Sequence, residues 1–515
     1  MSLLSPKNIP IPYHSNQIRI GHVPVDSPSG IVAAVRFIRG RWPILLLISI
    51  ILLVPCYWHS HIEAGDLGSH MYNAWLAKLI QQGRAPGLWV ENIRQNVLFD
   101  RVVSSFGSLF GFRLAERLAV SLAVLLFFWS VFAFICAVSR AVPWTLLPAL
   151  AMVTYGWTFN MGFFNYYLAV GFSFLGLSVV SGERGWKRPL AILLIPLMLL
   201  AHPLGLVWFF CASAYILLSE KLPRRLHSVL LAVTGAILFL VHRFLSSHFR
   251  VSSSNRPFYS INGVDQLVVY GNRNRFLAAA VFLFTIGCFV FDAVQRRNEK
   301  GYLSRVSLPL QLYFATEMGV LLLPSLIHIP RYAAPVSFLV ERLSLVSAVL
   351  VLALLGTLRQ RAWHAIGFGL LACVFFSFLY QDTARINSME AQVEKMVSIL
   401  SPGTRVMATI LRLPGTPVYL MEHIVDRACI ERCFSYTNYE PSSSQFRVRA
   451  LPGNGIVVAN VKEREEIENG TYVVRAQDLP AIQIYQCSSS GTDLCTRKLE
   501  EGETNDRFGI HPGRH

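Results

Sequence analysis

Long runs of apolar residues, separated by short polar segments, dominate the first three quarters of this chain. Several runs reach the roughly 20 residues that an α-helix needs to cross a bilayer. The pattern predicts a mainly α-helical, polytopic transmembrane bundle of about eleven spans. The predicted spans are residues 42–58, 117–138, 143–159, 163–181, 189–201, 204–219, 227–244, 276–294, 307–326, 333–356 and 363–380. The spans 189–201 and 204–219 are short, so one broken or re-entrant element is the alternative.

The pattern changes after residue 380. Residues 385–400 place apolar side chains on one stripe, which predicts an amphipathic helix, and Ser401-Pro402-Gly403 ends it. Short strand-like runs follow, at Arg405–Leu411, Val418–Val425, Gly455–Val461, Thr471–Arg475 and Ala481–Cys487. These elements predict a small C-terminal α+β domain.

Three parts of the chain follow from this pattern. Residues 1–41 are rich in proline and predict a disordered cytoplasmic tail. Residues 42–380 form the predicted transmembrane domain, with two long outside loops at 59–116 and 245–275. Residues 381–515 form the predicted extracytoplasmic domain.

Composition supports a membrane protein and excludes a nucleic-acid binder. The chain is 53% hydrophobic and only 15% charged, and its mean hydropathy is +0.45. Residues 1–380 hold 31 of the 46 Lys and Arg but 13 of the 30 Asp and Glu, so the net charge of +16 belongs to the membrane part. The basic residues lie mostly in short loops on one predicted side, which places the N-terminus in the cytoplasm and the C-terminal domain outside.

The C-terminal region holds four cysteines, Cys429, Cys433, Cys487 and Cys495. An even number in an outside domain predicts one or two disulfides in an oxidising compartment. A zinc site is the alternative, although neither close pair has CxxC spacing.

An acidic cluster, Glu63-Ala-Gly-Asp66-Leu-Gly-Ser-His70, follows the first predicted span directly. Charges are scarce in this part of the chain, so two carboxylates and a histidine at the edge of a span indicate a site. Asp66 or Glu63 can act as a general base. Asp66 with His70 could hold a divalent metal, helped by Glu63 or His61. The structural alternative is that Asp66 caps a helix and His70 faces water.

Residues 71–83 form an amphipathic stretch after this cluster, with Met71, Trp75 and Leu79 on one stripe. Such a helix would lie on the outer membrane surface and hold the acidic cluster at headgroup height. The alternative is a helix packed on the neighbouring spans.

Other polar residues are expected at the outer edges of spans. Arg331 could bind a phosphate through its planar fork, with His328 or His202 beside it. The alternatives are a snorkelling arginine and a structural histidine. Asn160 and Asn165 lie in an aromatic segment that is mostly an interfacial belt, and with Trp75 they could line a substrate groove.

Three charges are expected inside spans. Glu341 and Arg342 fall about ten residues into the predicted span 333–356, near the middle of the membrane. Glu317 is a similar case in the preceding span. Structural pairing explains these residues, and a proton or substrate path is the alternative.

The layout resembles the GT-C superfamily of polytopic membrane glycosyltransferases, among them protein O-mannosyltransferases and bacterial aminoarabinose transferases. The resemblance rests on the first span, the acidic motif Glu63…Asp66…His70, the juxtamembrane helix, the many further spans and the C-terminal outside domain. Phe159–Tyr167, Ala201-His202-Pro203 and Pro330-Arg331-Tyr332 are similar to segments of uncharacterised bacterial members.

The resemblance implies an enzyme of the bacterial inner membrane that moves a sugar from a polyprenyl-phosphate donor to an extracytoplasmic glycan, lipid or protein acceptor. It implies Asp66, or else Glu63, as the base, His70 as a ligand of a metal or the acceptor, and Arg331 as the partner of the leaving phosphate. The first loop lacks the adjacent paired acids of familiar members, so the choice of base stays open. A transporter or flippase for lipid-linked cargo, and a non-catalytic glycan-assembly protein, are the alternatives.

Overall fold

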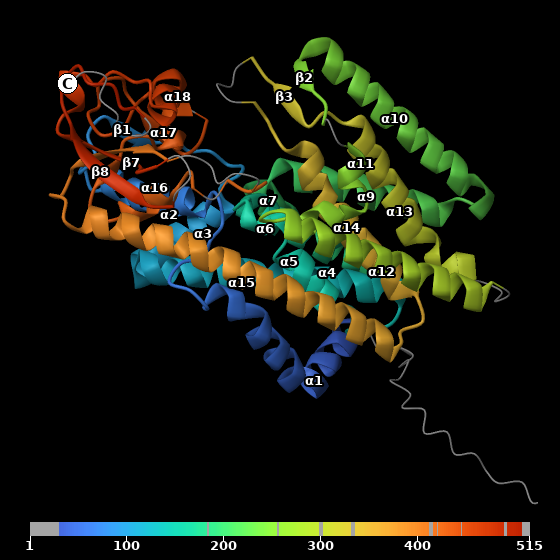
Figure 1. Cartoon of the computed structure of the whole chain (residues 1–515). Coiled ribbons are helices and arrows are strands. Elements are labelled where there is room, and N and C mark those ends of the chain that lie inside the picture. The colour runs from blue at the N-terminus through green and yellow to red at the C-terminus, as the bar shows by residue number, and fades with distance from the viewer. Residues whose placement is uncertain are drawn as a thin grey trace, which may run out of the picture.

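A helical bundle and a smaller sheet-containing domain lie side by side in the structure, a computed structural model (Figure 1). It describes residues 30–182, 185–254, 257–297, 302–330, 335–410, 416–419, 421–443, 445–488 and 492–506. Most of the predicted tail and the phosphate candidate Arg331 lie outside the described residues. Helix α1 begins at Gly30, so the last part of the predicted disordered tail is helical.

Within the described residues, six helices are long and apolar enough to cross a membrane, which indicates a membrane protein. They are α4 (Phe112–Ser139), α9 (Pro203–Lys221), α10 (His227–His248), α12 (Asn272–Arg296), α14 (Leu339–Thr357) and α15 (Ala362–Ser398). Shorter apolar helices accompany them, in α1 (Gly30–Leu53), α7 (Phe164–Val180), α8 (Ile195–Ala201) and α13 (Tyr302–Leu322). The apolar pattern therefore predicted helices correctly, while the number of spans stays a prediction.

The helices of the bundle differ in how much of their surface is buried. Helices α4, α7 and α14 are largely buried, whereas no residue of α10 is buried and its apolar side chains face outward. In a soluble protein such an apolar surface would be a liability, but it suits contact with lipid. Figure 1 shows α10 along one edge of the bundle.

Three of the expected elements have different bounds in the structure. The predicted span 143–159 is broken into α5 (Leu147–Thr154) and the short α6 (Trp157–Asn160). In contrast, the predicted span 363–380 and the predicted amphipathic helix 385–400 are one continuous helix of 37 residues, α15. Helix α15 therefore joins the bundle to the C-terminal domain without a break.

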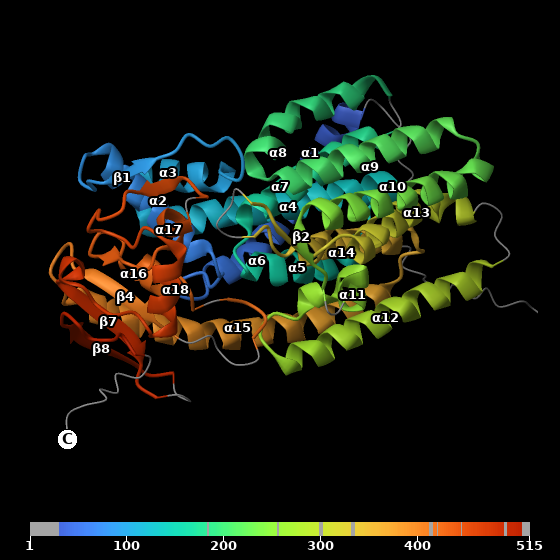
Figure 2. The same cartoon turned by 90° about the horizontal axis from the view of Figure 1, so that it is seen from above.

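The loop after α1 carries two helices, α2 (Leu67–Gln81) and α3 (Leu98–Phe110). Figure 2 shows both beside the C-terminal domain. Strand β1 (Leu88–Val90) of this loop pairs antiparallel with β6 (Val448–Ala450), so the loop and the C-terminal domain share a two-stranded sheet. A second ribbon pairs β2 (Arg250–Ser252) with β3 (Leu326–His328), and β2 contacts α10. The short helix α11 (Pro257–Ser260) follows β2 in the chain.

The C-terminal domain is built on a four-stranded sheet of order β5-β4-β7-β8. The first three strands are parallel and β8 is antiparallel to β7. The strands are β4 (Arg405–Thr409), β5 (Phe434–Ser435), β7 (Ala481–Gln486) and β8 (Leu494–Leu499), and the helices are α16 (Ile424–Ala428), α17 (Tyr439–Ser443) and α18 (Val461–Asn469). The strand predictions at Arg405–Leu411 and Ala481–Cys487 are confirmed over β4 and β7, whereas those at 418–425, 455–461 and 471–475 are wrong.

Candidate functional site

The backbone of the acidic loop is held by the turn between α6 and α7. The N–H of Gly65 donates to the carbonyl of Asn160 at 2.7 Å, and the N–H of Asp66 donates to that of Met161 at 3.0 Å. Gly162 makes this approach possible, because its φ is +79° and a Cβ there would lie 2.4 Å from the Asp66 nitrogen. The carboxylate of Asp66 is thus carried on a fixed backbone.

Asp66 occupies the N-cap position of α2, but its side chain makes no capping hydrogen bond. In the part of the chain that the structure describes, no donor hydrogen-bonds its carboxylate, which is 28% exposed. Burial raises the pKa of Asp66, and Glu422 adds to the rise, while His423, His70 and Arg342 oppose it. A carboxylate with a raised pKa and free oxygens is suited to accept a proton.

His423, which the sequence reasoning missed, is the nearest cationic partner of Asp66. Its Nε2 lies 3.9 Å from Oδ1 of Asp66, and its Nδ1 lies 2.8 Å from Oδ2 of Asp426. The Ser435 hydroxyl donates to the other oxygen of Asp426. Burial disfavours the charged imidazole, but Asp426 and Asp66 outweigh it and raise the pKa of His423 to about 9. At neutral pH the C-terminal domain therefore presents a positive charge to Asp66.

His70 faces a different carboxylate. Its Nδ1 lies 2.8 Å from Oδ1 of Asp100 in α3, and Oδ2 of Asp100 accepts a hydrogen bond from the amide of Asn165 at 3.0 Å. Arg447 approaches the same carboxylate at 3.6 Å. Burial opposes ionisation of Asp100, but His70 and Arg447 outweigh it and hold its pKa well below the usual value. His70 is thus a member of an ion-paired group and does not hydrogen-bond Asp66.

Arg342 lies close enough to Asp66 to lower its pKa, and it comes from the first turn of α14. The expectation that Glu341 and Arg342 sit in mid-membrane is wrong, because α14 begins only at Leu339. The Arg342 guanidinium lies 4.3 Å from the Phe163 ring centroid, and its Nε is buried without a hydrogen-bond partner among the described residues. An arginine held over aromatic rings with unused donors is suited to bind an anion.

His202 lies near Arg342 and also has a structural role. Its Nδ1 accepts a hydrogen bond from the N–H of Leu204 and caps α9. Its ring packs edge-on against Tyr166, at 5.4 Å between centroids, and the Tyr166 hydroxyl donates to the carbonyl of Arg342. His328, in contrast, is an exposed residue at the end of β3, opposite Arg250 of β2.

Glu63 has an environment unlike that of Asp66. One oxygen accepts a hydrogen bond from the amide of Asn387 at 2.7 Å, and the other lies 3.3 Å from Arg427. Arg427 also pairs with Glu390 at 2.6 Å and with Glu116 at 3.1 Å, so one buried arginine meets three glutamates. We call Arg427, Glu63, Glu116 and Glu390 the arginine cluster. Both oxygens of Glu63 are engaged there, which argues against the alternative that Glu63 is the base.

The predicted groove residues Asn160, Asn165 and Trp75 have protein neighbours in the structure, and a role in substrate binding stays a prediction. The Asn160 amide donates to the carbonyls of Tyr155 and Gly156 and accepts from the Tyr270 hydroxyl, so it stabilises the break after α5. The Asn165 carbonyl oxygen accepts from the backbone N–H of Phe99, and its amide holds Asp100. Trp75 is buried in α2, between Tyr72 and Phe434. The two amides are thus engaged within the protein, and Trp75 packs α2 against the C-terminal domain.

Helix α2 is likewise buried over most of its length, and it packs between α3 and α16 rather than on a membrane surface. In the C-terminal domain, disulfides join Cys429 to Cys433 and Cys487 to Cys495. Across the described residues, no three His, Cys, Asp or Glu side chains are placed to hold a metal ion.

Comparison of the chain with protein-family models, with curated proteins and with solved structures found no significant match. The geometry of the site is therefore the basis for any statement about function. It brings together Asp66, His423, Arg342 and His202, from the first loop, the C-terminal domain and two helices of the bundle. A helical i, i+3 pair of His423 and Asp426 was the sequence signal that could have revealed the partner of Asp66.

Proposed function

We propose that this chain is a membrane glycosyltransferase that moves a sugar from a polyprenyl-phosphate donor to an acceptor hydroxyl, with Asp66 as the base. The observation that carries the proposal is the carboxylate of Asp66, which is fixed by its backbone, raised in pKa and free of hydrogen bonds in the described structure. The GT-C-like layout, with two helices between the first apolar helix and α4, agrees with the proposal.

In the proposed step, the acceptor hydroxyl gives its proton to Asp66 while its oxygen attacks the anomeric carbon. The bond between that carbon and the phosphate oxygen breaks, and polyprenyl phosphate leaves with the electron pair. Arg342 is a described cation that could neutralise the leaving phosphate, and the predicted Arg331 lies outside the described residues. The charged His423 keeps Asp66 ionised in the resting site.

A purified-protein assay tests this proposal directly. The full chain in detergent is incubated with a panel of radiolabelled polyprenyl-phosphate sugars, and transfer by Asp66→Asn is compared with that by Asp493→Asn. Asp493 is an exposed aspartate of the C-terminal domain, so its variant is the matched control. We expect Asp66→Asn to lose about 10²–10⁴-fold in rate and Asp493→Asn to stay within about twofold.

Two results would overturn the enzyme proposal: no transfer by the wild-type chain across a broad donor panel, or full activity of Asp66→Asn. A transporter would instead be indifferent at Asp66 and sensitive at Glu341, whose carboxylate accepts hydrogen bonds from the Ser325 hydroxyl at 2.8 and 3.0 Å. Repeating the assay with a chelator tests whether a divalent metal joins Asp66 and His70.

A further inference from the structure

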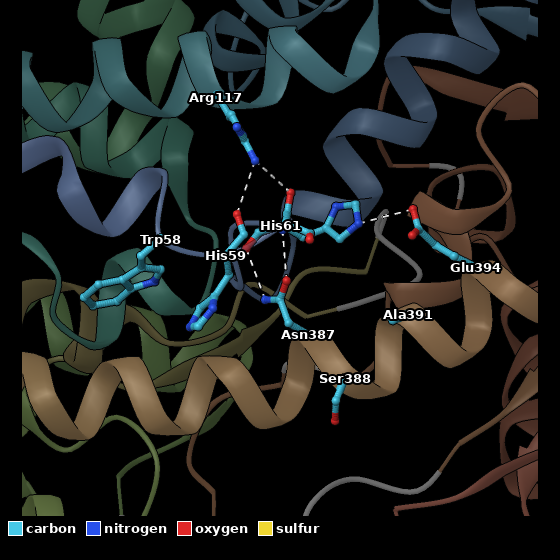
Figure 3. A pocket seen from close by; sticks show the side chains of 9 residues that line it. Trp58, His59, His61, Arg117, Asn387, Ser388, Ala391 and Glu394 are labelled. Atoms are coloured by element: carbon cyan, nitrogen blue, oxygen red, sulfur yellow. Dashed lines mark hydrogen bonds and ion pairs between the residues drawn. The ribbon is translucent and has the colours of Figure 1, made fainter.

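A separate cavity lies on the other side of the acidic loop, where the end of α1 meets α4 and the middle of α15 (Figure 3). Its volume is about 500 Å³, which is enough for a small polar ligand. The lining includes Trp58, His59, His61, Arg117, Asn387 and Glu394. None of the residues around Asp66 lines it, so the cavity is distinct from the candidate active site.

Arg117 is the charged side chain of this cavity with unused donors. Its Nη2 donates to the carbonyls of His59 and Ser60, at 3.2 and 3.3 Å. The guanidinium also lies 5.6 Å from the Tyr57 ring centroid. Its remaining N–H groups have no hydrogen-bond partner among the described residues, and they are not buried in protein. Figure 3 shows the guanidinium above the loop that lines the cavity. A fixed guanidinium with free N–H groups is suited to bind a phosphate oxygen.

The other charges of the cavity are already compensated. Glu394 lies 3.2 Å from Nε2 of His61 and 3.8 Å from Arg113. His61 also lies 4.0 Å from both Glu116 and Glu390, behind the cavity. Those two carboxylates are in turn paired with Arg427. Among the described residues, no carboxylate pairs with Arg117, and an anion in the cavity would supply the missing negative charge.

The cavity is placed where an apolar outer surface ends. On α1 and the turn after it, Ile50, Ile51, Val54 and Tyr57 are 57%, 60%, 51% and 46% exposed. The outer face of α15 exposes Ile366, Leu370, Val374 and Tyr380 in the same way. Trp58 and His59 then pack on Tyr380, with ring centroids 5.4 and 4.7 Å away. Aromatic residues at the end of an apolar surface are typical of the membrane–water boundary.

We propose that this cavity binds the phosphate headgroup of an anionic membrane lipid, held by Arg117, with the acyl chains along the exposed apolar faces of α1 and α15. The apolar faces favour a lipid over a soluble phosphate, because a free anion would have no use for them. This inference does not depend on the proposed transfer reaction, since it concerns other residues and another ligand contact.

Native mass spectrometry of the full chain tests the proposal. The detergent-solubilised protein is titrated with phosphatidylglycerol or with phosphatidylcholine, and bound lipid is counted. We expect the anionic lipid to bind more tightly, and Arg117→Gln to weaken its binding about tenfold, the cost of one charged hydrogen bond. Arg101→Gln is the matched control, because Arg101 is an exposed arginine of the neighbouring helix α3 that also donates to a backbone carbonyl.

A second variant keeps the test decisive if Arg117→Gln fails to fold. Ala391 is an exposed lining residue, so Ala391→Phe should fill the cavity without changing a charge and should weaken binding as well. Equal binding of the two lipids, or unchanged binding by Arg117→Gln and Ala391→Phe, would overturn the proposal. Displacement of the lipid by inorganic phosphate at equal concentration would identify a soluble anion as the ligand and would also overturn it.

Discussion

Glu63 and Asp66 lie three residues apart in one loop, yet the fold treats them in opposite ways. Glu63 is 3% exposed, and both of its oxygens have partners, in Asn387 and Arg427. Asp66 is held through its backbone, and its carboxylate accepts no hydrogen bond from the residues that the structure describes. A buried carboxylate with an arginine partner therefore stabilises the structure. A carboxylate that is positioned only through its backbone remains available for proton transfer.

The largest expected effect comes from removing the partner of Glu63. Arg427→Met would leave three buried glutamates facing one another, and breaking a buried ion pair in this way costs about 3–5 kcal/mol. We expect a thermal unfolding midpoint far below that of wild type, or no monodisperse protein in detergent. Arg432→Met is the control, because Arg432 is exposed five residues further along the chain. Equal midpoints for the two variants would show that the arginine cluster does not stabilise the fold.

The second expected effect is a difference in transfer rate between variants of Asp66 and of Glu63. Asp66→Asn should lose about 10³-fold in transfer rate with an unchanged unfolding midpoint. Glu63→Gln should lose less than about tenfold. Burial, together with Glu390, raises the pKa of Glu63 well above its usual value, so a neutral amide there relieves repulsion. Single-turnover rates and thermal unfolding of both variants check this contrast, and a reversed order of rates would assign the base to Glu63.

The pH dependence of the unfolding midpoint tests whether His423 pairs with Asp426. Its pKa is raised from 6.5 to about 9, so its stabilising contribution is complete below pH 6.5 and is lost as the pH rises through about 9. The contribution is on the order of 3 kcal/mol at most. Unfolding midpoints of wild type should fall across this window, while those of His423→Gln should fall less. Parallel curves for the two proteins would contradict the pairing of His423 with Asp426.

The smallest expected effect concerns the contact between α2 and the C-terminal domain. A Cβ at Gly68 would lie 2.3 Å from the backbone oxygen of His423, so Gly68→Ala must push the two apart. Overpacking of this kind costs about 1–3 kcal/mol, and it should also lower transfer activity by displacing His423. Gly369→Ala in α15 meets no atom within 4 Å and is the control. A Gly68→Ala variant as stable and active as this control would show that the contact is loose.

Local patterns of the sequence predicted much of the fold. Apolar runs predicted helices throughout the bundle, and the alternating runs at β4 and β7 predicted strands. The continuity of α15 was not predicted, although the absence of glycine and proline between Leu370 and Ser401 is a sequence signal for it. The break at residues 155–156 could not be predicted from the sequence. It depends on hydrogen bonds that the Asn160 amide donates to two backbone carbonyls.

The candidate site was predictable only in part, because its partners come from distant segments. Asp66 and His202 could be selected as scarce polar residues beside apolar runs. The contacts of His423 and Arg427 with the acidic loop could not be predicted. These residues follow Asp66 by more than 300 positions, and local sequence patterns do not indicate contacts over such a separation. The position of Arg342 within its helix was predicted wrongly, because the apolar run begins before α14 does, at Leu339.

The pairing of Glu63 with Arg427 also has a consequence for biosynthesis. The two residues are 364 positions apart, so at roughly 5–20 residues per second about 20–70 s pass between their synthesis. During that time Glu63 has no Arg427 beside it, although the turn between α6 and α7 that holds the loop backbone has already been made. We expect the buried carboxylates to reach their final contacts only after α16 has been made. The side-chain contacts of the acidic loop would therefore mature later than its backbone contacts.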